Sequence, residues 1–202
     1  MITIHNFARG ARGVRVAWLC EEMGLPYALK AYDFPVPAEY LAINPLGQVP
    51  FLQDDGGVAI TESVAMLLYV AQRYGPTALM PAAGDPSFAR VLQMTVFGEG
   101  SLGATINPLL MDRFGAPEGA KGGWLVDAQT QRLNGTVAYA ATVLGDQPYF
   151  AGDGFTVADI SVATAFAMWR GALGGVLPPT LAAYMDRVTA RPAYQRANSP
   201  AA

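Results

Sequence analysis

The stretch from Asn44 to Ser63, NPLGQVPFLQDDGGVAITES, constrains the fold more than any other part of the chain. After an initial turn, the apolar run Val49–Leu52 predicts a short buried strand. The Asp-Asp-Gly-Gly sequence at 54–57 predicts a tight reversal, and Val58–Ile60 predicts a returning strand. Thr61–Ser63 then supplies hydroxyls and a carboxylate ahead of an apolar-periodic run. The stretch therefore predicts a β-hairpin that leads directly into a helix.

Pro50 is the unusual residue of this hairpin, because proline has no N–H group to donate to a strand ladder. A trans Val49–Pro50 bond would open an edge strand. A cis bond would instead turn the main chain of Val49 outward, toward an extended ligand. The residues alone leave both conformations open.

Strands and helices alternate over the first 76 residues. Ile2–Asn6 alternates apolar and polar residues, as a half-buried strand does. Apolar residues recur at helical spacing from Val16 to Met23, and Gly24 ends that helix. Tyr27–Tyr32 predicts a second strand. With the hairpin and its helix, these elements predict an α/β thioredoxin-like N-terminal domain over residues 1–76.

The remainder of the chain predicts helices only. Residues 77–86 lack periodicity and contain two prolines, which indicates a linker. Thr156 and Asp159 have the spacing of a capping box at a helix start. We expect an all-α C-terminal helical domain over residues 87–202, with helices at about 87–114, 121–144, 155–169 and 179–190 and a short last one from Pro192.

Composition narrows the classes of function. The chain has 202 residues, 52% of them hydrophobic, and a formal net charge of −3, which favours a packed core and no nucleic-acid partner. Its single cysteine indicates a reducing compartment. The longest uncharged run, Gly171–Met185, is too short and too proline-broken to span a membrane, and Met1–His5 does not resemble a signal peptide. We expect a cytoplasmic protein without a membrane segment.

Motifs in three regions of the chain resemble the cytosolic glutathione transferases and occur in the family's order. Gly47–Leu52 (GQVPFL) and Glu62–Ser63 are similar to the family's glutathione-binding strand, with its cis-proline, and to the helix start that follows it. Phe155–Ala163 (FTVADISVA) resembles a helix start in the family's helical domain, and Ala190–Arg196 (ARPAYQR) resembles its usual ending. The resemblance implies the two-domain glutathione transferase fold and a two-fold homodimer.

The resemblance also implies which residues bind glutathione: Gln48, Val49, Pro50, Glu62 and Ser63. The helix start at Ser63 suits the γ-glutamyl carboxylate, since unpaired N–H groups and the helix dipole favour an anion. The main chain of Val49 would pair with the cysteinyl backbone. Glu62 would face the γ-glutamyl ammonium group, and Gln48 a carboxylate. The alternative is that Ser63 only caps its helix and that Glu62 belongs to its solvated first turn.

The sequence departs from the family where the thiol is activated. A free thiol has a pKa near 8.5, and the family usually lowers it with a Tyr, Ser or Cys after the first strand. Residues 6–13, NFARGARG, contain none of these. The candidates are Arg12 and Arg9 through their charge, N–H groups around Ala11 at the helix start, and Asn6. Alternatively, both arginines are solvated or pair with carboxylates.

Two further residues receive structural interpretations. Cys20 lies on an apolar helix face, and buried cysteines usually pack as small hydrophobes. Without a Cys-x-x-Cys motif, dithiol exchange is excluded. His5, the only histidine, lies within the first strand, which favours a structural role. With one His and one Cys, no metal site is expected.

We expect an apolar cleft between the two domains for the electrophile. By resemblance its lining would include Phe7, Phe97, Ser101 and Met111. Packing within the core would explain Phe97 and Met111 nearly as well.

The leading hypothesis is an enzyme that uses glutathione as co-substrate, without a metal, and promotes attack of its thiolate on a small apolar electrophile. A non-catalytic binding or scaffold protein of the same fold is one alternative, which the missing hydroxyl favours. A glutathione-dependent peroxidase, isomerase or ether-cleaving enzyme is another, since it would use the same thiolate. The intact GQVPFL and ES motifs favour an enzyme.

Overall fold

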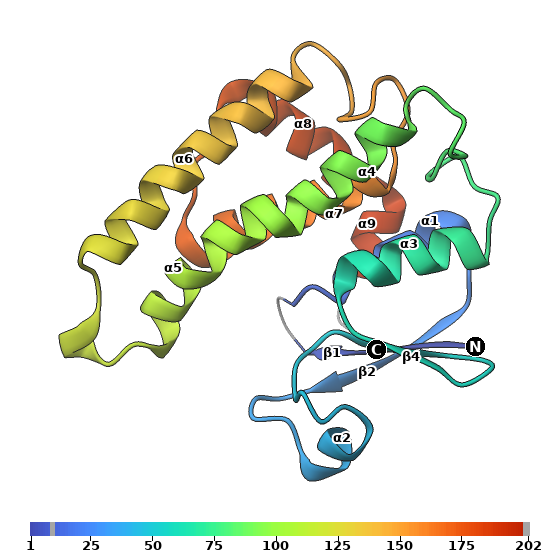
Figure 1. Cartoon of the computed structure of the whole chain (residues 1–202), viewed down its shortest axis with the longest axis horizontal. Helices are drawn as coiled ribbons and strands as arrows, with labels where there is room; N and C mark the ends of the chain where they lie inside the picture. The colour runs from blue at the N-terminus through green and yellow to red at the C-terminus, as the bar shows by residue number, and fades with distance from the viewer. Residues whose placement is uncertain (9–10, 200–202) are drawn as a thin grey trace. The chain divides into compact units, whose positions relative to one another are not determined.

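The computed structural model describes residues 1–8 and 11–199 and divides the chain into two compact units. The first unit comprises Met1–Met80 and the described residues from Thr189 onward, and the second comprises Pro81–Val188. Figure 1 shows strands only in the first unit and a set of helices in the second. This is the thioredoxin-like and all-α pair of units that the sequence predicts.

The first unit is built on a four-stranded mixed sheet in the order β2-β1-β3-β4. Strand β1 (Ile2–Phe7) pairs parallel with β2 (Tyr27–Tyr32) and antiparallel with β3 (Phe51–Asp54). Strand β4 (Val58–Ile60) returns antiparallel to β3, so the Asp-Asp-Gly-Gly reversal forms as predicted. Gly56 and Gly57 both have positive φ, the left-handed conformation that such a turn requires and that glycine adopts without strain.

Three helices cover this sheet. Helices α1 (Val14–Met23) and α3 (Ser63–Arg73) pack against each other on one side of it, whereas α2 (Ala38–Ile43) lies on the other side (Figure 1). The core lies between the sheet and the first two helices. Its fully buried side chains include Ile4 and Leu52 from the strands and those of α1 and α3 at helical spacing, Val16, Leu19, Cys20, Met66, Leu67 and Val70.

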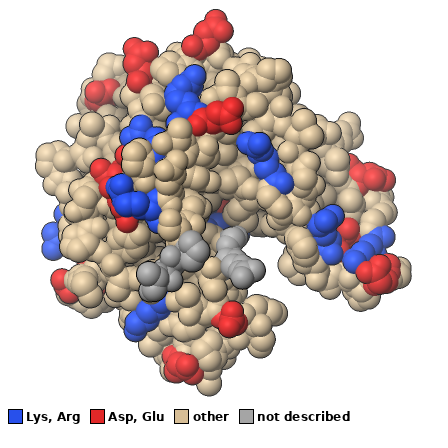
Figure 2. All heavy atoms as spheres, turned by 180° about the vertical axis from the view of Figure 1, so that it is seen from behind, with Lys and Arg blue, Asp and Glu red and all other residues tan. Residues whose placement is uncertain are grey.

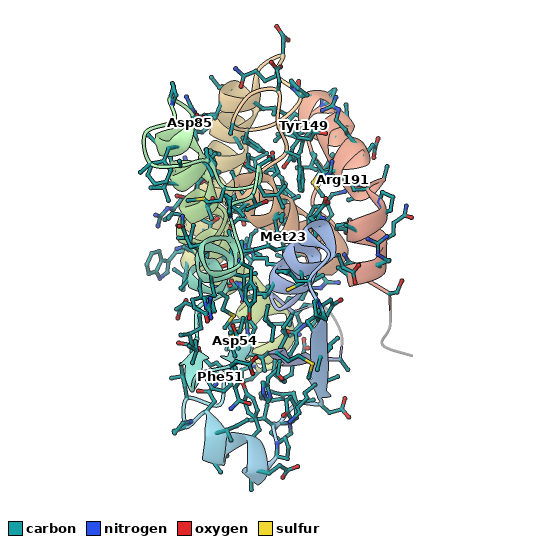
Figure 3. The ribbon with its side chains drawn as sticks, turned by 90° about the vertical axis from the view of Figure 1, so that its right-hand side faces the viewer. Met23, Phe51, Asp54, Asp85, Tyr149 and Arg191 are labelled. Atoms are coloured by element: carbon teal, nitrogen blue, oxygen red, sulfur yellow. The ribbon has the colours of Figure 1, made fainter. Side chains whose placement is uncertain are left out.

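The end of the chain packs with this first unit. Helix α9 (Pro192–Ala197) lies against α1, as Figure 3 shows at Met23 and Arg191. The rings of Trp18 and Tyr194 meet edge to face at 4.8 Å, and both Nε and Nη2 of Arg191 donate to the carboxylate of Glu22, at 2.6 and 2.7 Å. The unit boundaries therefore differ from the sequence-based division, which assigned all of residues 87–202 to the helical domain.

The second unit consists of helices. Helix α7 (Val157–Leu173) is buried along most of its length and packs against α4 (Phe88–Phe97) and η1 (Gly98–Gly103), a π-helical segment that continues into α5 (Ala104–Gly115). The remaining elements are η2 (Glu118–Ala120), α6 (Trp124–Leu144) and α8 (Pro179–Thr189). The single helix expected over 87–114 thus contains a π-helical turn.

The capping box predicted at the start of α7 is present. The N–H group of Ala158 donates to Thr156 Oγ1 at 3.3 Å, and the N–H group of Thr156 donates to Asp159 Oδ2 at 2.9 Å. Asp159 is fully buried and also accepts bonds from the N–H group of Phe150 and the hydroxyl of Tyr184. Burial raises the pKa of Asp159 to about 6, against the lowering effect of these bonds.

Within residues 1–8 and 11–199, no helix combines the length and the apolar character needed to cross a bilayer. The face seen in Figure 2 is largely uncharged, and its Lys and Arg residues are interspersed with Asp and Glu.

Candidate functional site

Three strand ends of the first unit meet at one edge of the sheet. Strands β3 and β4 are antiparallel, and Leu52 pairs with Ile60. Extending this register by two residues on each strand brings Pro50 opposite Glu62. The pairing of His5 with Phe51, continued in the same way, brings the end of β1 toward Pro50. Helix α1 follows β1 and helix α3 follows β4, so both helices begin near this edge. Helix N-termini favour negative charge, and this edge can therefore attract an anion.

A buried arginine joins the two helix starts. Arg15 Nη1 donates a hydrogen bond to Ser63 Oγ at 2.8 Å, and the Arg15 side chain has no exposed surface. Ser63 is the first residue of α3 and is 4% exposed. Its hydroxyl thus binds Arg15. Within the described chain it makes no hydrogen bond to an N–H group of α3, so Ser63 does not cap this helix. Sequence reasoning missed Arg15, because its partner Ser63 lies 48 residues away in the chain.

Glu62 has an unusual backbone conformation. Its φ of 66° makes it the one non-glycine residue with positive φ among those the structure describes. Such a conformation costs on the order of 1–3 kcal/mol and often occurs at ligand-binding positions. The residue is exposed, so its carboxylate lies at the surface beside the first turn of α3.

The Val49–Pro50 peptide bond is cis. The carbonyl oxygen of Gln48, one peptide earlier, accepts hydrogen bonds from the Tyr40 hydroxyl at 2.6 Å and from Asn44 Nδ2 at 2.8 Å. The Gln48 side chain itself is exposed. Within the described part of the chain, the N–H and C=O groups of Val49 bind no other main-chain group. Both are therefore available to an extended ligand.

The turn that leads into α1 is held by Asn6. Its Oδ1 accepts the N–H group of Gly13 at 3.2 Å, and a Cβ atom on Gly13 would lie only 2.4 Å from Asn6 Cγ. This close approach requires glycine. Ala11 and Arg12 lie in the same turn and are half-exposed, whereas Arg9 falls outside the described residues.

The electrophile-pocket candidates fall into separate places. Phe97 and Ser101 line a groove of about 400 Å³ in the second unit, together with Gln93, Val96, Gly100 and Tyr139. Met111 does not line that groove. It is 67% exposed, so core packing does not explain its position. Phe7 belongs to the first unit, where its ring meets that of Phe34 at 6.1 Å.

The remaining sequence candidates lie in the interior. Burial raises the pKa of the Cys20 thiol to about 12, which makes it unreactive at neutral pH. His5 is buried and bonded through Nδ1 to the Tyr32 hydroxyl and through Nε2 to Gln53 Oε1. Burial lowers the pKa of His5. In the described residues, no group of three His, Cys, Asp or Glu side chains is arranged to hold a metal ion.

Comparison with known proteins gives two matching family models. The model described as glutathione S-transferase, N-terminal domain, matches residues 12–73, and the corresponding C-terminal domain matches residues 125–187.

Similar proteins and structures extend these matches over nearly the whole chain. Glutathione S-transferase 3 of Zea mays is 30% identical, covering 91% of this chain and 86% of its own. A glutathione transferase structure from Methylococcus capsulatus aligns at a TM-score of 0.85 with 28% identity, covering 98% of this chain and 97% of that one. A sphingomonad glutathione S-transferase complexed with glutathione aligns at 0.81 with 26% identity, covering 97% and 96%.

Proposed function

The chain belongs to the glutathione S-transferase family, and on that premise we propose that it is an enzyme that activates glutathione. Glutathione would bind at the edge of the first unit, and its thiolate would attack a small apolar electrophile. The observation that carries this proposal is the convergence at one sheet edge of the Val49 main chain, Pro50 and the start of α3.

Each part of glutathione has a matching group at this edge. The unpaired N–H and C=O groups of Val49 suit the cysteinyl backbone, as in strand addition. The first turn of α3 suits the γ-glutamyl carboxylate. The exposed carboxylate of Glu62 can face the γ-glutamyl ammonium group, and the exposed side chain of Gln48 a carboxylate. The mostly buried Ser63 would contact the ligand chiefly at its backbone while its hydroxyl stays with Arg15.

Thiol activation must come without a hydroxyl or thiol in residues 6–13. Lowering the thiol pKa by about two units requires roughly 2.7 kcal/mol of preferential binding to the thiolate. We assign this to the positive charge of Arg12, supported by Arg9 and by the helix start around Ala11. The thiol proton passes to solvent. The sulfur lone pair then forms a bond to the electrophilic carbon, and the leaving group departs with its electron pair.

The electrophile would be small and apolar. The groove beside Phe97 and Ser101 supports this class, since the rings of Phe97 and Tyr139 and the side chain of Val96 form half of its lining. Phe7 and the exposed Met111 lie outside the lining of this groove, and their contact with the electrophile is proposed from the resemblance alone. We also expect the homodimer that is usual in the family.

The test is a glutathione titration that follows thiolate absorbance, on wild type and on Arg12→Ala and Arg9→Ala. Arg73→Ala serves as the matched control, since Arg73 is an exposed arginine at the far end of α3. Thiolate should form near pH 7 in wild type and in the control, and the thiol pKa should rise by about one unit in Arg12→Ala. A protein that binds no glutathione would overturn the proposal.

A non-catalytic glutathione-binding protein is the second candidate, favoured by the absent hydroxyl. Tight binding without ionisation near pH 7 would select it. Ionisation that neither arginine variant changes would move the activating role to Asn6 or to the N–H groups near Ala11. Turnover of a hydroperoxide or of a glutathionyl ether, without transfer to an activated chloronitrobenzene, would select the peroxidase or ether-cleaving alternative.

A further inference from the structure

The carbonyl of Gln48 is held from behind by two side chains of the α2 region. Tyr40 lies within α2 and is fully buried, and Asn44 follows the helix as its C-cap and is 4% exposed. The Tyr40 hydroxyl donates to Gln48 O at 2.6 Å, and Asn44 Nδ2 donates to the same oxygen at 2.8 Å. Asn44 Nδ2 also donates to the Tyr40 hydroxyl at 3.1 Å. The three groups form a closed set, which we call the Gln48 clamp.

The clamp determines the direction of the Val49 N–H group. The carbonyl of Gln48 and the N–H of Val49 belong to one peptide unit, and the bond between these residues is not among the cis bonds of the described chain. In a planar trans peptide, the C=O and N–H groups point in opposite directions. Since the clamp draws the carbonyl toward Tyr40 and Asn44, the N–H of Val49 must point away from them.

The clamp is itself fixed by an aromatic cluster. The Tyr40 ring lies 4.7 Å from that of Tyr32 and 5.7 Å from that of His5, and it meets the Phe51 ring edge to face at 6.5 Å. Phe51, labelled in Figure 3, begins β3 immediately after Pro50. Tyr40 is the one buried residue of α2, so this helix is anchored to the unit mainly through the same ring.

We infer that Tyr40 and Asn44 are positioning residues for glutathione, acting through the Gln48 carbonyl to aim the Val49 N–H at the cysteinyl carbonyl of the ligand. This inference rests on the proposed function. Neither side chain touches the ligand or the reacting sulfur. The loss of the clamp should therefore weaken glutathione binding while the chemical step at saturating glutathione proceeds unchanged.

The test compares two Tyr→Phe variants from the same aromatic cluster. Tyr40→Phe removes the hydroxyl that holds Gln48, whereas Tyr32→Phe removes one that bonds His5 Nδ1. Tyr40→Phe should raise the dissociation constant and the KM for glutathione about threefold to tenfold. Its kcat, and its KM for a chlorodinitrobenzene electrophile, should stay within twofold of wild type. Tyr32→Phe should leave all four values unchanged, and Asn44→Ala should act like Tyr40→Phe.

A ligand-free measurement separates the clamp from the proposed function. The Val49 amide resonance should shift or split in Tyr40→Phe and stay in place in Tyr32→Phe, as followed in amide NMR spectra without glutathione. Wild type that binds no glutathione would overturn the proposed function and with it the assignment of the ligand, while this resonance would still report on the clamp. Equal loss of affinity in both variants, or none in Tyr40→Phe, would overturn the positioning role.

Discussion

Glu62 combines a strained backbone with an exposed charge at the start of α3. Glycine adopts positive φ without the steric penalty that glutamate meets. We therefore predict that the free energy of unfolding of Glu62→Gly is higher than that of Glu62→Gln by about 1 kcal/mol. Both variants lose the carboxylate, and both should bind glutathione more weakly than wild type. Urea denaturation and calorimetric titration measure the two effects.

The comparison with Glu62→Gln isolates the backbone effect, because glutamine retains the side chain and the strained φ but loses the charge. Equal stability of the two variants would show that the conformation at residue 62 carries no cost. Unchanged glutathione affinity in both would remove Glu62 from the site.

Single residues of the site were predictable where their chemistry is local. Pro50 and Glu62 stand out through turn and helix-start signals that lie within a few residues of them. Arg15 and Tyr40 do not. Arg15 is buried and donates to Ser63, 48 residues away in the chain, and a single sequence gives no sign of that partner. An arginine without a known partner is expected at the surface, since burying an unpaired charge is costly.

At the scale of elements, the π-helical turn η1 depends on a close crossing with α7. A Cβ atom on Gly98 would lie 2.3 Å from Ser161 Oγ and 2.6 Å from its carbonyl carbon. Ser161 Oγ also donates to the carbonyl of Thr95 at 2.7 Å. We predict that Gly98→Ala lowers the free energy of unfolding by about 1–3 kcal/mol, because the backbone of α7 cannot yield cheaply.

Gly100→Ala is the matched control within the same turn. The nearest atom to its added Cβ is Val96 Cγ1 at 3.6 Å, an ordinary contact. This variant should be as stable as wild type or more stable by about 0.5–1 kcal/mol, because alanine loses less backbone entropy than glycine. Denaturant unfolding of both variants checks the pair, and a Gly98→Ala protein as stable as Gly100→Ala would contradict the close crossing.

The buried carboxylate at the start of α7 predicts a pH dependence. Asp159 has a pKa of about 6 in the folded protein and an ordinary value of 3.8, because burial disfavours its charge. Between these pH values the folded state binds more protons than the unfolded chain. The contribution of Asp159 to the free energy of unfolding is therefore complete below about pH 4 and is lost as the pH rises through about 6.

The measurement is the free energy of unfolding of wild type relative to Asp159→Asn from pH 4 to pH 7. The difference should fall with rising pH by at most about 1.4 kcal/mol per pH unit. The other carboxylates are common to both proteins and cancel. A difference that stays level, or that increases with pH, would show that the hydrogen bonds to Asp159 outweigh its burial.

Elements were predictable where one segment contains its own signal. The hairpin at 54–57 and the capping box at Thr156 have local signals, and both formed. The π-helical turn within 87–114 had none, and it begins at Gly98, which closely approaches Ser161 from a helix more than 60 residues later. The periodicity of apolar residues shows that a helix is present, but it does not show where the backbone of another helix crosses it.

For the whole molecule, the order of a mixed unit followed by helices was visible in the sequence, but the role of the last helix was not. Its motif resembles the usual ending of the family's helical domain, and chain order placed it there. Its contacts instead tie it to α1. A short helix of six residues gives no periodic pattern strong enough to show which surface it covers.

Removal of α9 should therefore weaken the first unit. Truncation after Thr189 takes away the Tyr194 ring from the fully buried Trp18 and the two hydrogen bonds of Arg191 from Glu22. We predict that the melting temperature falls by at least about 5 °C, since apolar surface of α1 becomes exposed and Glu22 loses its ion pair with Arg191. The tryptophan emission, to which Trp124 and Trp169 also contribute, should shift to longer wavelength as water reaches the Trp18 indole ring.

Two single variants divide this effect between its causes. Arg191→Ala removes the ion pair and leaves the aromatic cover, so it should lower the melting temperature by less and leave the Trp18 emission in place. Tyr194→Ala should shift the emission while the Arg191 pair persists. Because α1 also presents Arg15 to Ser63, glutathione affinity should fall with truncation in parallel with stability. A truncated protein with wild-type emission and melting temperature would show that α1 stays covered without α9.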